Sequence, residues 1–228
     1  MPYMTFFHAA DGTDREDLHT WLTNTLGPST ALSDGQLTRL DIQLAQPRPA
    51  GFNMPADMEL TSDDAPSTPY DGVLVLDGSD AAVRKVLDGE FADRTSTRHT
   101  YRVTEKVIFD KGVRRGLPTP GVKFLLSLKF HSDMPESAIR RSWHAHEPLA
   151  ERVHVGSDRY VQWWVDAAVT AEAPAIEGVV EMNFPTEDDL VHRFFDSERG
   201  ELEIVQDSAH FIAGGHPRVY LAEYVFGS

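Results

Sequence analysis

The sequence contains no cysteine at all. This absence excludes disulfides, thiolate nucleophiles and cysteine-ligated zinc or iron–sulfur centres, so any catalysis must use histidine, carboxylate, tyrosine, serine or lysine side chains. The chain also lacks an apolar run near the roughly 20 residues that a membrane span requires, and its first residues lack the basic start of a signal peptide. We therefore expect a cytoplasmic protein that does not associate with a membrane.

Basic residues are scarce as well. The 228 residues include 21 Lys and Arg against 36 Asp and Glu, a formal net charge of -15. Nucleic-acid binding rests on neutralising phosphates with basic side chains, so this composition disfavours a nucleic-acid partner. The acidity is typical of a solubility feature.

Three short segments recur in the same order in the two halves of the chain. Residues 70–76 and 176–182 each place an acidic–glycine pair before a strand-like run, and residues 103–109 and 220–226 each place a glutamate before an apolar pair. At the starts of the halves, a Phe-His pair precedes an acidic helical segment that reaches Trp21 in one half and Trp143 in the other. The shared order indicates an internal duplication.

The repeated pattern predicts an α+β fold in which each half has the order βαββαβ, the split βαβ unit of ferredoxin-like proteins. We expect a degenerate first half at 1–111, a linker at 112–121 and a second half at 122–228. The loop 47–69, rich in Pro, Asp, Ser and Thr, is interpreted either as a flap over a pocket or as decoration. The predicted helices are 14–26, 80–91, 135–153 and 186–195, and the predicted strands are 4–8, 37–44, 71–76, 100–109, 122–130, 159–169, 178–184 and 219–226.

The helix expected at 135–153 carries a histidine on its apolar face. Spacings of four, three, four and three place the following residues on one inward stripe: Ile139, Trp143, His146, Ala150 and Val153. His144 lies roughly 200° around the helix and faces solvent. A His-x-His pair shares a face on a strand but not on a helix, so the pattern disfavours a metal site. An inward histidine is either hydrogen-bonded in the core or part of a functional site.

Polar side chains elsewhere favour the functional interpretation. Tyr160, Gln162 and Trp164 alternate along the next strand and give one of its faces a polar character. Further along, Asp207 and Phe211 share a face if their segment is helical. An acid and a histidine beside a semi-polar cavity are typical of a proton-transfer pair.

These residues resemble the EthD-type family of the dimeric α/β-barrel superfamily. The resemblance covers most of 122–227 and rests on Trp143 and His146 as a Trp-x-x-His motif, on Leu149, on the strand at 159–162, on the Glu-Gly segment at 177–181, and on Asp207 with Phe211-Ile212. In the first half, Trp21 matches the motif, but Asn24 stands where the histidine would fall.

The resemblance implies antiparallel four-stranded sheets, each with two helices on one face, that close into a barrel within one chain or between two chains, with a homodimer optional. It implies a pocket between the second sheet and its helices that takes a small-molecule substrate. On this interpretation the catalytic residues are His146, Asp207 and Tyr160. The implied substrate-binding residues are Trp143, Gln162, Trp164, His210 and Phe211.

The function that these residues favour is cofactor-independent acid/base catalysis by a lyase, dehydratase, cyclase or isomerase on a small apolar or aromatic, polyketide-like metabolite. No cofactor or metal is expected, so purified protein should contain no stoichiometric zinc or iron. The alternatives are a non-catalytic small-molecule-binding or accessory protein of a catabolic pathway, a haem enzyme with His146 or His210 as axial ligand, and a cofactor-free monooxygenase. Fold alone does not choose among them.

Overall fold

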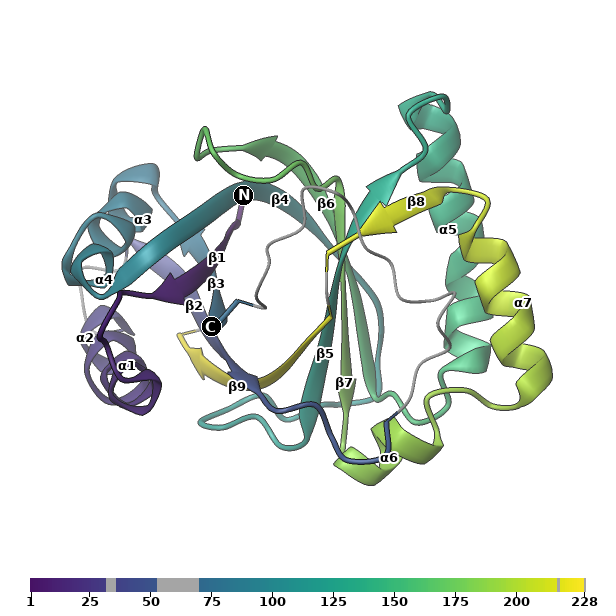
Figure 1. Ribbon diagram of the computed structural model, residues 1–228, viewed down its shortest axis with the longest axis horizontal. Helices are drawn as coiled ribbons and strands as arrows, with labels where there is room; N and C mark the ends of the chain where they lie inside the picture. The colour runs from purple at the N-terminus through teal and green to yellow at the C-terminus, as the bar shows by residue number, and fades with distance from the viewer. Residues whose placement is uncertain (32–35, 53–69, 217, 228) are drawn as a thin grey trace.

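A nine-stranded antiparallel sheet, closed into a barrel, forms the centre of the molecule (Figure 1). The computed structural model describes residues 1–31, 36–52, 70–216 and 218–227. The strands follow the order β7-β6-β4-β1-β3-β2-β9-β5-β8, and an additional β7–β5 pairing closes the ring. Among the described helices, none is both long and apolar enough to cross a bilayer.

The first half has the expected ferredoxin-like order. Its strands are β1 (Tyr3–Ala9), β2 (Leu37–Gln46), β3 (Gly72–Gly78) and β4 (Thr95–Asp110), and its helical segments are α1 (Arg15–Trp21), the π-helical η1 (Leu22–Leu26), α2 (Gly27–Ala31), α3 (Asp80–Leu87) and α4 (Glu90–Asp93). The Asp14 and Ser79 side chains cap the N-termini of α1 and α3 by accepting backbone N–H groups. The helix expected at 80–91 is broken near Gly89, which lies between α3 and α4.

The second half repeats this order with two additions. Its elements are β5 (Val122–Phe130), α5 (Glu136–Val153), β6 (Arg159–Ala168), β7 (Gly178–Phe184), α6 (Glu187–His192), α7 (Glu198–Ser208), β8 (Ile212–Gly215) and β9 (Val219–Phe226). The helix predicted at 186–195 is too long, because the chain leaves α6 after His192 and buries Phe194 in the core. A new helix, α7, then starts with Ser197 as its cap.

Two seams join the halves into one barrel within a single chain. At one seam β2 pairs with β9, from Leu40 opposite Phe226 to Gln46 opposite Tyr220. At the other seam β4 pairs with β6 along most of their lengths. The helices of the first half lie on one side of the barrel and α5, α6 and α7 lie on the other (Figure 1). The barrel therefore needs no second chain.

Strand alternation divides the apolar residues into three cores. One fills the barrel interior, with Trp163 and Leu125 among its members. Another lies between the first half's sheet and its helices, around Phe7 and Trp21. The third lies between the second half's sheet and its helices, and contains Trp143 and Phe211. Each of these two outer layers contains a hollow lined by the described residues.

A buried ion network occupies part of the barrel interior. The Lys123 ammonium lies 3.2 Å from a Glu181 carboxylate oxygen and 2.5 Å from a Glu223 oxygen, and all three side chains are buried. Arg115, in the connection between the halves, bonds Glu223 at 2.7 Å and Asp41 at 2.6 Å. These bonds hold the connection at 112–121 against the barrel.

The start of the loop at 47–69 reaches the second half. Phe52 is 3% exposed and its ring packs against those of Phe124, Phe194 and Tyr220. The chain after β2 runs to the side of the barrel where α6 lies (Figure 1). Residues 53–69, the rest of the loop interpreted as a flap or decoration, lie outside the described residues.

Candidate functional site

The inward face of α5 positions the candidate histidine. Ile139, Trp143, His146, Ala150 and Val153 are all buried, as the apolar spacing predicts. The helix packs with this face toward the sheet of the second half. The His146 side chain is 8% exposed.

His146 forms a hydrogen-bonded pair with Asp207. The Nδ1 atom of His146 lies 2.6 Å from Oδ2 of Asp207, on α7, and the Asp207 side chain is 41% exposed. Burial lowers the pKa of His146, and the hydrogen bond that the ring makes to the Asp207 carboxylate opposes only part of that effect. A neutral ring that donates its Nδ1 proton to the carboxylate has an unprotonated Nε2. In this arrangement Nε2 of His146 can accept a proton, and the partly exposed Asp207 carboxylate holds the ring in position through Nδ1.

A cavity of about 60 Å³ lies beside this pair. It is smaller than the roughly 300 Å³ at which pockets for drug-sized ligands begin, so it admits a small molecule or one end of a larger one. Trp143, His146, Tyr160 and Phe211 all line it. The Phe211 ring lies edge-on to the imidazole of His146, with centroids 5.6 Å apart.

Tyr160 contributes a buried hydroxyl to the same cavity. Its oxygen accepts a hydrogen bond from Nε2 of Gln162 at 3.2 Å. Burial raises the pKa of Tyr160 to about 12, so the phenol keeps its proton at neutral pH.

His154 is a second histidine of the cavity that the sequence analysis missed. Its Nδ1 lies 2.8 Å from the backbone oxygen of Phe194, to which it donates. Burial lowers the pKa of His154 to about 4, so the ring is neutral at neutral pH. His154 is the C-cap of α5, outside the helix and with non-helical backbone angles, so the spacing along α5 does not place its ring.

Arg218, Ser208 and Phe194 also line the cavity, and the sequence analysis did not single them out. The Arg218 guanidinium lies 6.0 Å from the centre of the Phe124 ring. Arg218 immediately precedes β9 and Ser208 ends α7, so only the folded chain brings them to α5. No sequence spacing could have identified them.

Other residues of the predicted site lie elsewhere. Gln162 and Trp164 line a second cleft of about 240 Å³ between α5 and the strands β4 and β6, together with His144. The Arg140 guanidinium stacks on Trp164 at 3.7 Å. His210 is exposed after the end of α7, and its Nδ1 lies 2.6 Å from the backbone oxygen of Gln206.

His144 faces away from the cavity, as its place on the helix predicts. Its side chain is 74% exposed. Its Nδ1 lies 3.1 Å from both Lys106 Nζ and a Glu147 oxygen. Across the described residues, no group of three or more His, Asp or Glu side chains is arranged to hold a metal ion.

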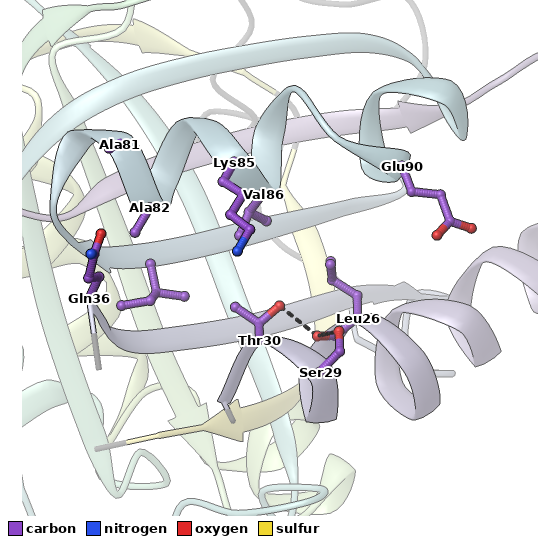
Figure 2. Close-up of a pocket in the computed structure, with 10 residues that line it drawn as sticks. Leu26, Ser29, Thr30, Gln36, Ala81, Ala82, Lys85, Val86 and Glu90 are labelled. Carbon is purple, nitrogen blue, oxygen red and sulfur yellow. Dashed lines mark hydrogen bonds between the residues drawn. The ribbon is translucent and has the colours of Figure 1, made fainter. Parts of the chain in front are cut away.

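The first half has a larger hollow without comparable chemistry. This hollow, of about 410 Å³, lies between α2 and α3, where Figure 2 shows Lys85 and Glu90 with the apolar side chains of Leu26 and Val86. Its described lining contains no histidine. Asn24, which takes the motif position of His146, is exposed within η1. Volume alone therefore does not locate the candidate site.

Comparisons with known proteins identify the architecture. No family model and no curated protein matches the chain. A solved monooxygenase candidate from Fusobacterium nucleatum superposes with a TM-score of 0.59 at 10% identity, covering 100% of this chain and 94% of the other. An anthrone oxidase-like protein gives the same score and identity over 100% and 93% of the two chains.

A mutant chlorite dismutase from Candidatus Nitrospira defluvii superposes with a TM-score of 0.56 at 10% identity, over 97% and 91% of the chains. Most of the matched proteins are named as enzymes, and the identities are too low to transfer an activity. The fold of this chain is that of the tandem ferredoxin-like α/β-barrel proteins.

Proposed function

We propose that this protein is a cofactor-independent enzyme that transfers protons on a small apolar or aromatic metabolite, with His146 as the general acid/base. The observation that carries the proposal is the 2.6 Å contact between Asp207 and Nδ1 of His146, a residue that lines the cavity. Acid/base lyases, dehydratases, cyclases and isomerases use such a transfer.

The physical argument starts from the cost of burying a histidine. Every other member of the α5 stripe is apolar, so a leucine in place of His146 would pack there without an unpaired polar atom. The hydrogen bond to Asp207 offsets the free-energy cost of burying the polar ring, and it also fixes the tautomer of the ring. A placed histidine raises the rate of proton transfer by roughly a hundredfold to ten-thousandfold.

The resemblance to EthD-type proteins supports the same site, because its Trp-x-x-His motif corresponds to Trp143 and His146. Both residues line the cavity. The remaining lining is largely apolar and aromatic, which favours a substrate of that character.

The haem alternative fits the described residues poorly. A macrocycle needs a pocket of several hundred Å³, against the cavity of about 60 Å³ beside His146. His210, the other candidate axial ligand, is exposed and outside that cavity.

A cofactor-free monooxygenase is the second candidate function. The names of two matched structures, a monooxygenase candidate and an anthrone oxidase-like protein, favour it. Removal of a proton from the substrate by His146 would be its first step as well. A monooxygenase would consume oxygen when substrate is added, and a lyase or an isomerase would not. Measurement of oxygen consumption therefore distinguishes these functions.

Because the natural substrate is not identified, His146 can be tested as a base with a simple carbon acid, a compound that loses a carbon-bound proton. Nitroethane is small, and its loss of a carbon-bound proton in deuterated buffer is followed by proton NMR. We expect the protein to accelerate this exchange, and His146→Gln to lower the rate roughly a hundredfold or more with the fold retained.

Two further variants complete the test. Asp207→Asn should also lower the rate, because the amide lacks the carboxylate's charge and its N–H₂ group can donate to Nδ1, which favours the tautomer that is protonated at Nε2. His144→Gln is the matched control on the opposite helix face and should leave the rate unchanged. Equal loss in His144→Gln and His146→Gln would contradict the proposal, and absence of exchange in the unmodified protein would favour a non-catalytic binding protein.

A further inference from the structure

The hollow of the first half lies between two helices, on the side of the barrel opposite to α5 (Figures 1 and 2). Its volume is about 410 Å³. Helix α3 contributes Ala82, Lys85 and Val86, which share one helix face because they are spaced by three and four residues. Pockets for small molecules occupy roughly 300 to 1,000 Å³, so the hollow is large enough for a ligand.

The apolar part of the hollow is aliphatic. It is formed mainly by Leu26, Leu37 and Val86, which belong to the core between the first half's sheet and its helices or pack against it. The lining that the structure describes includes no aromatic ring. It differs in this respect from the cavity beside His146, and it favours a ligand with an aliphatic chain.

Two side chains of the hollow offer hydrogen-bond donors to a ligand. Figure 2 shows the Lys85 nitrogen pointing from α3 toward α2, across the hollow. Among the described residues, this ammonium has no hydrogen-bond or ion-pair partner. The side-chain oxygen of Gln36 accepts a hydrogen bond from Ser79 Oγ at 3.3 Å, which leaves the amide N–H₂ group as a donor.

The other polar groups of the lining are already bonded within the protein. The hydroxyls of Ser29 and Thr30 both donate to the backbone oxygen of Leu26, at 3.0 and 2.7 Å, so their protons are not available to a ligand. The Glu90 carboxylate lies 2.7 Å from the Arg94 guanidinium, which balances its charge. In the described lining, the donors left for a ligand are the lysine ammonium and the glutamine amide, and together they favour an anion.

We propose that this hollow is a second small-molecule site and that it binds a medium-chain aliphatic carboxylate. The two carboxylate oxygens face the donors of Lys85 and Gln36, and the chain lies along Leu26, Leu37 and Val86. Lys85 is exposed, so its ion pair with the ligand contributes little and the apolar chain supplies most of the affinity. The proposal does not depend on the proposed function.

Octanoate is the probe, and isothermal titration calorimetry measures its binding. We expect one saturable site, and a dissociation constant that falls roughly fourfold for each methylene added between hexanoate and octanoate. Lys85→Met keeps the apolar stem of the side chain and removes its charge. It should weaken octanoate binding severalfold and leave the binding of octan-1-ol unchanged. Arg84→Met is the matched control, because Arg84 is exposed on the same helix and does not line the hollow.

Methyl NMR of the protein locates the bound octanoate. Methyl resonances of Leu26, Leu37 and Val86 should shift as octanoate is added. Those of Val180 and Ile204, which line the cavity of the second half, should not shift. This measurement separates the proposed site from binding at the candidate catalytic site.

Filling the hollow gives a further test. Ala82→Phe places a ring in the space and should abolish octanoate binding, while near-ultraviolet circular dichroism shows that the packing is retained. The absence of saturable binding, or shifts confined to Val180 and Ile204, would overturn the site. Equal losses in Lys85→Met and Arg84→Met, or equal affinities of the unmodified protein for octanoate and octan-1-ol, would overturn the assignment of a carboxylate ligand.

Discussion

His154 makes a specific prediction about how stability depends on pH. Burial lowers the pKa of His154 to about 4 in the folded protein, against about 6.5 for an exposed histidine. The unfolded chain therefore binds a proton at a higher pH than the folded chain. The free energy of unfolding is highest above the unfolded pKa and falls as the pH is lowered from about 6.5 to about 4.

The magnitude follows from the separation of the two pKa values. At about pH 5 the unfolded imidazole is almost fully protonated and the folded one is only about a tenth protonated, which costs about 2 kcal/mol relative to about pH 7. For a chain of this length, a change of that size lowers the melting temperature by roughly 4–8 °C. His146, whose pKa is also lowered, adds to the effect in the same direction.

Urea denaturation of the unmodified protein and His154→Gln, at several values between about pH 7 and about pH 4.5, measures this difference. Glutamine keeps a side-chain N–H that can donate to the Phe194 backbone oxygen, and it has no proton to gain over this range. We expect the variant to lose about 2 kcal/mol of the pH dependence, and His144→Gln, which removes an exposed histidine, to retain it. A His154→Gln protein with the full dependence would refute the assignment.

Three other substitutions test the packing. Phe52→Ala should lower the free energy of unfolding by about 3 kcal/mol in urea denaturation, because it empties a position among three aromatic rings of the second half. Lys123→Met should cost about 3–5 kcal/mol by the same assay, since it leaves the buried Glu181 carboxylate without its cation. Gly121→Ala should cost far more than Gly112→Ala in a thermal melt. Both glycines have φ near +90°, but a Cβ at Gly121 would lie 2.0 Å from a backbone oxygen and one at Gly112 would meet no atom within 4 Å.

The repeat and the alternation of apolar residues predicted most of the fold, because strands and helices that bury one face leave a period in the sequence. Helix α7 left no such signal. Its Ile204 is buried, whereas Leu202 is 61% exposed, so the apolar residues do not form one stripe. Strand β8 has four residues, two of them glycine, and is too short to show alternation.

The candidate site was predictable only in part. The stripe on α5 placed His146 inward, because the spacing along one helix determines its face. Its contact with Asp207 depends on how α7 packs against α5, which no spacing within either helix encodes. The role of Gln162 was also hidden, since alternation placed it beside Tyr160 but could not show that it donates to the Tyr160 hydroxyl.

The closure of the barrel within one chain changes what substitution can do. In a barrel made of two identical chains, the two-fold axis copies every change into both pockets, so neither can be altered alone. Here β2 pairs with β9 and β4 with β6 inside one polypeptide, and a substitution occurs once. Loss of symmetry let one outer layer hold His146 and Asp207 while the other holds Asn24. It also let Phe52 of the first half pack into the hydrophobic core of the second half.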